Sequence, residues 1–182
     1  DYFKEGERLF ASNKPLEAIA MLDAAVKEDP TNEKAALWLG IAYQQSSRHE
    51  DAIQAFRKAL PEAKALRHLF YYNMGNSYFA LKKMAFAEEM YSSALVERDD
   101  YPGAYLNRAN ARMNLKKYDL AASDYAFYLA RVPDSPQKES IERVLAALRK
   151  GFEEEAARKA SEEAARIAEE ERRRALLAEV EA

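Results

Sequence analysis

Cysteine is absent from the 182-residue sequence, and glycine and proline are rare, at five and six residues. The lack of cysteine excludes disulfides and thiolate metal sites, and it does not decide between cytoplasm and periplasm. Few glycines and prolines, together with 48% apolar residues, favour helices over sheets. Strand-like alternation of apolar and polar residues is nowhere sustained, so the sequence predicts an all-α protein.

Long apolar runs are also missing. No stretch approaches the roughly 18 residues that span a bilayer, and no signal segment opens the chain. We therefore expect a soluble protein without direct membrane insertion. The net charge of −3 and the pI near 5.6 give no general attraction to phosphates, so no nucleic-acid partner is predicted. The first residue, Asp1, already lies in a helical pattern, which indicates a processed form or part of a longer protein.

One spacing recurs along the first 134 residues. Small residues and large residues return at successive intervals of 34, 35 and 34 residues. The columns are Gly6, Gly40, Gly75 and Ala109; Ala18, Ala52, Ala87 and Ala121; and Leu22, Phe56, Tyr91 and Tyr125. A fixed period of this length is typical of a helical solenoid. Small residues let two helices approach closely while the large residues fill the grooves beside them.

Two segments carry these columns in order, LWLGIAYQQSSRHEDAIQAFRKAL and YYNMGNSYFALKKMAFAEEMYSSAL. In the order of these small and large residues the sequence resembles the tetratricopeptide repeat family. The resemblance implies a right-handed α-solenoid of antiparallel helix pairs. It covers residues 1–134 as four repeats, at about 1–32, 33–66, 67–100 and 101–134.

Two departures from the family pattern stand out. Pro61 arrives early in a second repeat that is one residue longer. It either ends the preceding helix or starts a lengthened one, because proline fits the first turn of a helix and not its interior. In the fourth repeat Ala109 replaces glycine and Arg112 replaces an aromatic residue, so we expect different packing there.

Residues 135–152 predict a capping helix for the last repeat. Ser135 is the expected N-cap, with Pro136 in the first turn. One apolar stripe follows, made of Ile141, Val144, Leu145, Leu148 and Phe152.

Residues 153–182 predict a charged helical extension rich in Ala, Glu and Arg, a composition that favours a bacterial source. Five acid-to-base pairs stand four residues apart: Glu154–Arg158, Glu155–Lys159, Glu162–Arg166, Glu169–Arg173 and Glu170–Arg174. The extension is expected to be either a solvated spacer or a helix that self-associates through a narrow apolar face, hereafter the seam. The seam would contain Ala156, Ala160, Ala164, Ile167, Ala168, Leu176, Leu177 and Val180.

Residues that could carry catalysis are sparse. The glycines are scattered and form no phosphate loop. His49 and His68 lie on separate segments without a second metal ligand or a nucleophile. We therefore predict a protein that is not an enzyme, with no cofactor and no metal site.

The family resemblance implies that the first helix of each repeat lines a concave groove for a peptide or a protein segment. The predicted function is a non-catalytic interaction scaffold. The alternative is a structural element that forms a homo-oligomer through the long C-terminal helix or docks it in a neighbour's groove. The predicted peptide-binding residues are Leu37, Ile41, Gln44, Tyr72, Asn73, Asn76, Phe79, Leu106, Asn107, Asn110, Met113 and Asn114.

A specialised form of the family binds the C-terminal carboxylate of chaperones with two asparagines and three basic residues. Asn76 and Asn107 match the two asparagines. Tyr72, Gln137 and Ile141 stand where lysines and an arginine are needed, so we predict no carboxylate clamp.

Overall fold

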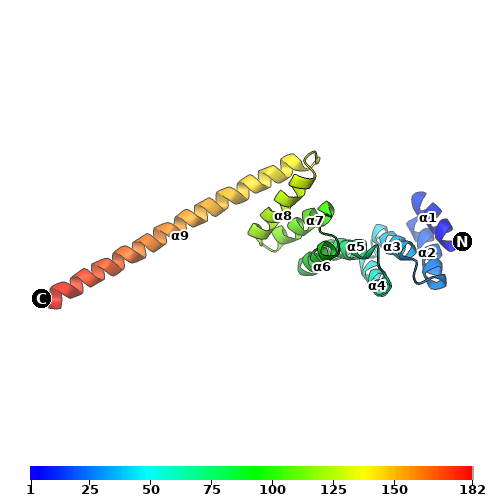
Figure 1. Cartoon of the computed structure of the whole chain (residues 1–182), viewed down its shortest axis with the longest axis horizontal. Coiled ribbons are helices and arrows are strands. Elements are labelled where there is room, and N and C mark those ends of the chain that lie inside the picture. The colour runs from blue at the N-terminus through cyan, green and yellow to red at the C-terminus, as the bar shows by residue number, and fades with distance from the viewer. Residues whose placement is uncertain (182) are drawn as a thin grey trace. The chain divides into compact units, whose positions relative to one another are not determined.

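The computed structural model describes residues 1–181, with side chains up to Ala178. The predicted all-α fold is confirmed, since this part of the molecule has nine helices and no strand (Figure 1). The helices are α1 (Tyr2–Ala11), α2 (Pro15–Glu28), α3 (Glu33–Gln45), α4 (His49–Ala59), α5 (Arg67–Ala80), α6 (Met84–Glu97), α7 (Pro102–Asn114), α8 (Tyr118–Arg131) and α9 (Lys138–Glu181). They fall into two units, Asp1–Pro133 and the residues from Asp134 on.

The first unit is a row of four helix pairs, each closed by a turn of three residues. Every turn contains one residue in the left-handed region, with φ between 56° and 61°. These residues are Asn13, Ser47, Lys82 and Lys116. The backbone N–H that follows each of them donates to a carbonyl five residues back, as from Lys83 to Tyr78 at 2.9 Å. This hydrogen bond ends the first helix of each pair and reverses the direction of the backbone.

Within each pair the predicted small residue faces the predicted large one. A Cβ atom added to Gly75 would lie 2.5 Å from Cε1 of Tyr91, and one added to Gly6 would lie 2.7 Å from Leu22. Gly40 meets the ring of Phe56 in the same way. The cost of glycine in a helix is thus offset by close helix packing, as the sequence predicts.

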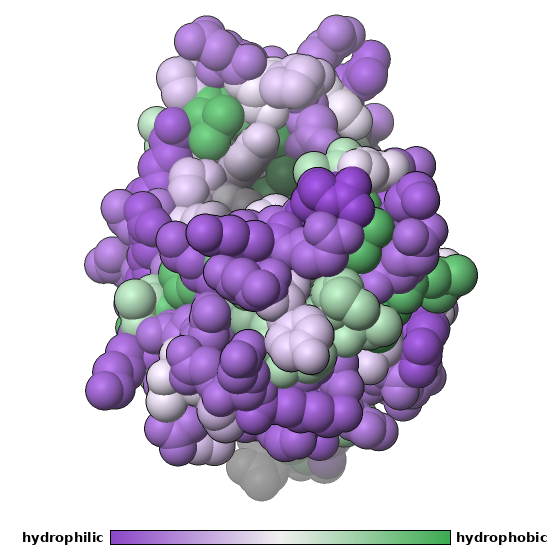
Figure 2. All heavy atoms as spheres, turned by 90° about the vertical axis from the view of Figure 1, so that its right-hand side faces the viewer, coloured by the Kyte–Doolittle hydropathy of each residue, from purple (hydrophilic) through white to green (hydrophobic). Residues whose placement is uncertain are grey.

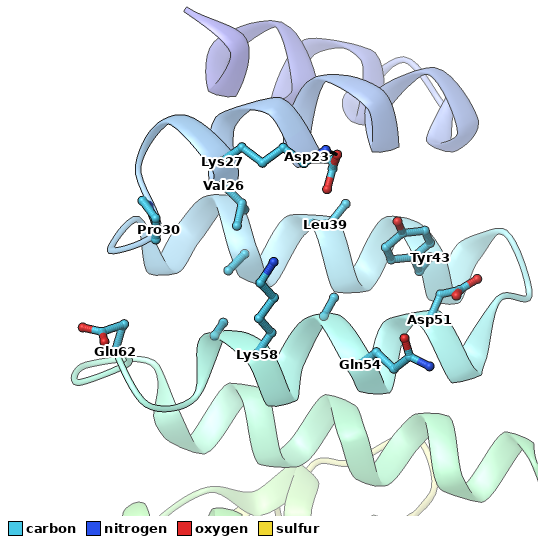
Figure 3. A pocket seen from close by; sticks show the side chains of 13 residues that line it. Asp23, Val26, Lys27, Pro30, Leu39, Tyr43, Asp51, Gln54, Lys58 and Glu62 are labelled. Atoms are coloured by element: carbon cyan, nitrogen blue, oxygen red, sulfur yellow. Dashed lines mark ion pairs between the residues drawn. The ribbon is translucent and has the colours of Figure 1, made fainter.

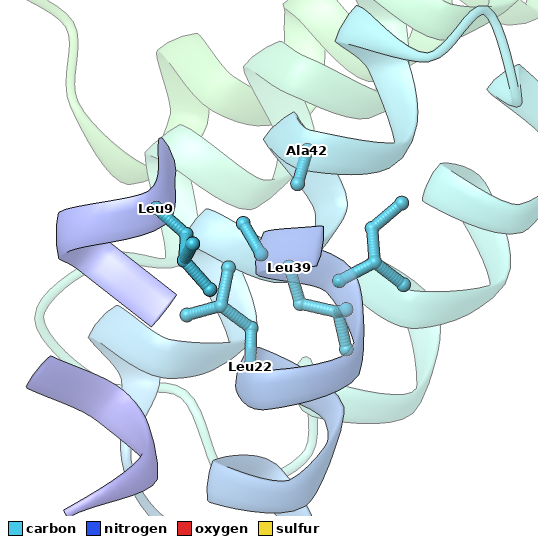
Figure 4. Close-up of a cluster of buried hydrophobic side chains, with 6 residues drawn as sticks. Leu9, Leu22, Leu39 and Ala42 are labelled. Atoms are coloured by element: carbon cyan, nitrogen blue, oxygen red, sulfur yellow. The ribbon is translucent and has the colours of Figure 1, made fainter. Parts of the chain in front are cut away.

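The apolar core runs between neighbouring helix pairs. Leu9 and Leu22 of the first pair are buried with Leu39 and Ala42 of the second (Figure 4). Further along, the rings of Phe56 and Phe70 lie 5.9 Å apart across the second and third pairs. Each pair therefore buries its apolar face against the next, which is how a solenoid acquires a continuous core.

The connection between α4 and α5 settles the role of Pro61. Helix α4 ends at Ala59 and α5 begins only at Arg67, so Pro61 lies just beyond the end of α4. The alternative of a lengthened helix starting at Pro61 is wrong. The carboxylate of Glu33 holds the connection, since it accepts hydrogen bonds from the N–H groups of Ala65 at 3.2 Å and Leu66 at 2.7 Å.

The fourth repeat replaces apolar packing with a partly buried ion-pair network around Asp124. Arg108 binds both oxygens of Asp124, at 2.8 and 2.9 Å. Arg112 bridges Asp124 at 2.7 Å and Glu88 of the third repeat at 2.9 Å. Lys117 completes the network at Glu88. The expected change in packing at Arg112 is confirmed, and its physical form is a set of paired charges.

The second unit is dominated by the single helix α9. The predicted N-cap at Ser135 with Pro136 in the first turn is wrong, because α9 begins only at Lys138. The Ser135 hydroxyl accepts from the N–H of Gln137 at 3.1 Å in the turn that precedes the helix. The predicted apolar stripe lies within α9, and its role as a cap for the fourth repeat stays a prediction.

The extension is exposed at every side chain from residue 153 to residue 178. Glu155–Lys159 forms as predicted, at 2.6 Å. Two further pairs run from base to acid, Arg158–Glu162 and Arg166–Glu170, and Arg166 also pairs with Glu163, three residues before it, at 2.6 Å. Of the five acid-to-base pairs in the sequence, all of them within the described side chains, only Glu155–Lys159 lies within ion-pair distance, because Glu154, Arg158, Arg166 and Glu170 pair with other neighbours. Val180 of the predicted seam lies outside the described side chains.

Candidate functional site

The first helices of the repeats lie closer together than the second helices do. Helix α3 touches both α1 and α5, and α5 touches α7, whereas α2, α4, α6 and α8 make no such contacts with one another. The row therefore curves with the first helices on its inner side. This inner side of α1, α3, α5 and α7, hereafter the groove, is where the sequence places the binding residues.

A pocket of about 260 Å³ opens in the groove between α5 and α7. Four of its lining residues were predicted from the sequence: Asn76, Phe79, Asn107 and Asn110. The other two, Ala80 and Tyr91, were not. Tyr91 belongs to the second helix of its pair, but it faces Gly75 and so reaches between the helices. Its phenol needs a hydrogen-bond partner when buried, and that requirement is the signal that could have placed it here.

Asn76 and Asn107 are joined directly. The Asn107 amide nitrogen donates to the Asn76 oxygen at 2.9 Å and to the Tyr72 hydroxyl at 3.0 Å. The Asn76 oxygen also accepts from the Tyr91 hydroxyl at 2.9 Å. These bonds link the third repeat to the fourth and fix the orientation of both asparagine side chains.

Asn110 repeats the arrangement one repeat later. Its oxygen accepts from the Tyr125 hydroxyl at 2.6 Å, just as the Asn76 oxygen accepts from Tyr91. In both pairs the tyrosine follows the asparagine by 15 residues. Each asparagine is thus held by the large residue of its own helix pair.

Each of the three asparagine amides in the pocket uses only one of its two polar groups in the bonds described above. The NH₂ groups of Asn76 and Asn110 and the oxygen of Asn107 have no hydrogen-bond partner among the described residues. None of these atoms is cut off from solvent. The pocket therefore presents two donor groups and one acceptor, in orientations set by bonds to neighbouring side chains. A peptide backbone, with its C=O and N–H groups, has the matching chemistry.

The other predicted polar residues are engaged locally. The Gln44 amide donates to the Asn73 carbonyl at 2.7 Å and to the Ser77 hydroxyl at 2.8 Å, which ties α3 to α5. Asn73 and Asn114 donate to carbonyls one turn back in their own helices, those of Leu69 and Asn110, at 2.8 Å. The structure does not bring these three side chains into the pocket.

The predicted apolar residues mostly form the groove surface beside the pocket. Leu37 and Ile41 are partly buried against the core of the second and third repeats. Leu106 and Met113 are also partly exposed, on α7. Together they extend an uncharged surface along the inner side of α3, α5 and α7.

Charge is absent from all twelve predicted residues. Arg108 and Arg112 of α7 are engaged in the ion-pair network with Asp124. The ring of Tyr72 lies 4.9 Å from that of Tyr101. Burial raises the pKa of Tyr72 above its ordinary value, so its hydroxyl stays neutral at pH 7. This end of the groove presents hydrogen-bonding groups and aromatic surface.

Other kinds of site find little support in residues 1–181. No group of three or more His, Cys, Asp or Glu side chains there is arranged to hold a metal ion. None of the described helices combines the length and the apolar character needed to cross a bilayer. Seen from the end formed by α1 and α2, the surface is largely hydrophilic, with small and separate apolar patches (Figure 2).

Comparison with known proteins identifies the repeat. The sequence model described as "Tetratricopeptide repeat" matches residues 3–66 and 72–136, which is more than half of the sequence. The chain belongs to the tetratricopeptide repeat family. The predicted family and fold class are thereby confirmed.

Individual tetratricopeptide repeat proteins are similar to parts of this chain. The rat (Rattus norvegicus) RNA polymerase II-associated protein 3 is 31% identical over 96 residues, which is 53% of this chain and 14% of that protein. The present sequence thus corresponds to a small part of that relative's length.

Solved structures show the same fold. A crystal structure of MamA protein superposes with a TM-score of 0.73 at 21% identity, over 86% of this chain and 85% of that one. The first repeat domain of Spaghetti (RPAP3), bound to the HSP90 peptide SRMEEVD, superposes with a TM-score of 0.55 at 26% identity. The match covers 62% of this chain and 86% of the Spaghetti domain.

Proposed function

We propose that this protein is a non-catalytic interaction scaffold that binds an extended segment of a partner protein in the groove. The observation that carries the proposal is the set of unpaired amide groups on Asn76, Asn107 and Asn110 in the pocket between α5 and α7. A bound segment would replace the water at these groups with its own backbone C=O and N–H groups. The family and its peptide-bound relative support the proposal.

The mechanism of binding follows from the rigidity of the site. Asn76 and Asn107 fix each other, and Asn110 is fixed by Tyr125. The amides therefore lose little conformational freedom when a ligand arrives, which favours affinity. Backbone contacts give little choice of sequence, so selectivity would come from apolar side chains that lie beside Phe79 and the uncharged surface of α3 and α7.

Peptides selected on the 182-residue protein from a displayed random library test this proposal. After titration of a selected peptide, the largest amide chemical-shift changes in the protein should fall on α5 and α7, around Asn76 and Asn110. Selected peptides that instead change the amide chemical shifts of the second helices alone would refute a binding site in the groove.

The mode of binding should differ from that of a carboxylate clamp. Tyr72 replaces one clamp lysine and is already engaged with Asn107, so the position beside the two matched asparagines carries a neutral hydroxyl. The peptide SRMEEVD should therefore bind no more tightly with a free C-terminal carboxylate than with an amidated end. Micromolar binding that is lost on amidation would show that a clamp operates.

A further inference from the structure

A second hollow lies among the helices on the outer side of the repeats, between α2 and α4 (Figure 3). Its volume is about 500 Å³, roughly twice that of the groove pocket. Ala36 and Leu39 of α3 form its floor, and Val26, Ala55 and Ala59 contribute apolar walls. This hollow, hereafter the crevice, is large enough to admit an aliphatic side chain from outside.

The crevice is open because a small residue replaces a larger one. Ala55 corresponds, at the repeat spacing, to Met90 in the third repeat and Asp124 in the fourth. Met90 packs against the core cluster of the second and third repeats, which includes Met74. Asp124 is paired with Arg108. The equivalent space is therefore occupied at the next two repeat junctions, and the repeat fold itself does not require this opening.

One ammonium group in the crevice is free. Lys27 is paired with Asp23 at 2.5 Å, and Asp51 is paired with Arg48 at 2.7 Å. Lys58 makes no ion pair with any described residue, and its side chain extends from α4 across the floor (Figure 3). Glu62, at the end of the crevice, likewise has no ion pair with a described residue. An entering group thus meets apolar surface together with one cation and one carboxylate that lack partners. An aliphatic side chain with a carboxylate near it has the complementary chemistry.

The same protein has a segment of that chemistry. On α9, Leu176 and Leu177 are 55% and 54% exposed in a stretch that is otherwise mainly Ala, Glu and Arg. Glutamates occupy residues 169–171, within about two helical turns of these leucines, and arginines occupy residues 172–174 between them, so the segment carries charges of both signs beside the leucines. Nothing in the extension covers this leucine pair, since every side chain from residue 153 to residue 178 is exposed.

We propose that the crevice between α2 and α4 receives the α9 extension of a second copy of this protein. Leu176 or Leu177 of one copy lies over Leu39 of the other, and a carboxylate from residues 169–171 pairs with Lys58. The contact is separate from the groove and does not depend on the proposed peptide-binding function.

Sedimentation equilibrium of the 182-residue protein, over micromolar to millimolar concentrations, tests the contact with two variants, their combination and a control. Ala55→Met fills the crevice with the side chain that Met90 provides in the next repeat, so the fold can accommodate it. Leu176→Ser/Leu177→Ser removes the occupant. Each should weaken self-association about tenfold or more, and combining them should weaken it no further because both remove one contact. Val96→Ser, at an 86% exposed position on α6, is the control and should change nothing.

A wild-type protein that stays monomeric over the whole range would overturn the proposal. So would self-association that depends on Leu176 and Leu177 but is unchanged by Ala55→Met, because the extensions would then be pairing with each other.

Cross-linking gives an independent readout, since the protein has no cysteine of its own. A mixture of the Gln54→Cys and Ala178→Cys variants should form the mixed disulfide. A mixture of the Val96→Cys and Ala178→Cys variants should form much less of it. Equal yields from the two mixtures would contradict docking in the crevice.

Discussion

The side-chain amide of Asn107 donates to the oxygen of Asn76 at 2.9 Å, across the junction between the third and fourth repeats. This one bond has two consequences. It orients both asparagines, and it uses the Asn76 oxygen while leaving the Asn76 NH₂ group free in the pocket. The groove is therefore prepared for binding by the same hydrogen bonds that join the repeats.

Alanine at Gly75 should destabilise the repeats. The added Cβ would meet the buried ring of Tyr91 at 2.5 Å, so Gly75→Ala should lower the free energy of unfolding by about 1–3 kcal/mol, as measured by urea denaturation. Gly151 is the matched control, because a Cβ there meets no atom within 4 Å. Gly151→Ala should raise the helicity of α9 in circular dichroism. A neutral effect of Gly75→Ala would mean that the helices can separate without cost.

Removal of Asp124 should be costly because this buried carboxylate neutralises two largely enclosed cations. The side chains of Arg108 and Arg112 are only 15% and 13% exposed, and both pair with Asp124. Asp124→Ala should lower the free energy of unfolding by about 3 kcal/mol. Asp100→Ala breaks the exposed pair with Arg98 and should change it by less than about 1 kcal/mol. Equal losses in the two variants would argue against a buried network.

Acid should weaken the junction between the third and fourth repeats. Desolvation alone raises the pKa of Glu88, but hydrogen bonds from Lys117 and Arg112 outweigh it and hold that pKa below the usual 4.5. The stabilisation is therefore present above pH 4.5 and is lost as the pH falls through the lowered pKa of the folded state. The melting temperature of Glu88→Gln should depend less steeply on pH below 4.5 than that of the wild type. Parallel profiles would contradict this role of Glu88.

The turns offer a stabilising change. Lys116 adopts a φ of 58°, a conformation that disfavours residues with a Cβ. Lys116→Gly should raise the free energy of unfolding by up to about 1 kcal/mol, measured by urea denaturation. Lys64→Gly is the control, because Lys64 is outside any left-handed turn, and it should not stabilise the protein. An equal rise in the free energy of unfolding for Lys64→Gly would mean that loss of a lysine, and not the backbone conformation, is the cause.

Much of the repeat unit could be predicted because the 34-residue spacing shows which residues occupy equivalent positions in successive helix pairs. Gly75 and Tyr91 belong to separate columns of the sequence, and the structure sets one against the other. Four of the six pocket residues followed from the helical spacing of the first helices. The partial exposure of Asn76 and Phe79 also agrees with their predicted place in the groove, while Met74 and Tyr78 of the same helix are buried.

The parts that escaped prediction depend on contacts between repeats. Helical spacing says which face Gln44 occupies, but not that its amide would reach the Asn73 carbonyl and the Ser77 hydroxyl. Arg112 was recognised as a departure, yet its partners Glu88 and Asp124 lie on two other helices. The crevice beside Ala55 arises because the Ala55 side chain is smaller than that of Met90, its counterpart in the next repeat. This difference in size leaves an opening only because the second helices do not touch one another, and the sequence does not show that separation.

Exchange of a single amide group tests the central claim most directly. Asn110→Asp keeps the oxygen that accepts from Tyr125 and replaces the free NH₂ donor with a carboxylate oxygen. Asn114→Asp makes the same exchange and adds the same charge at an exposed position whose amide bonds only its own helix. By isothermal titration with a library-selected peptide, Asn110→Asp should weaken binding by about tenfold to a hundredfold, and Asn114→Asp by less than about twofold. Equal affinities for the wild type and Asn110→Asp would contradict an amide grip on the peptide backbone.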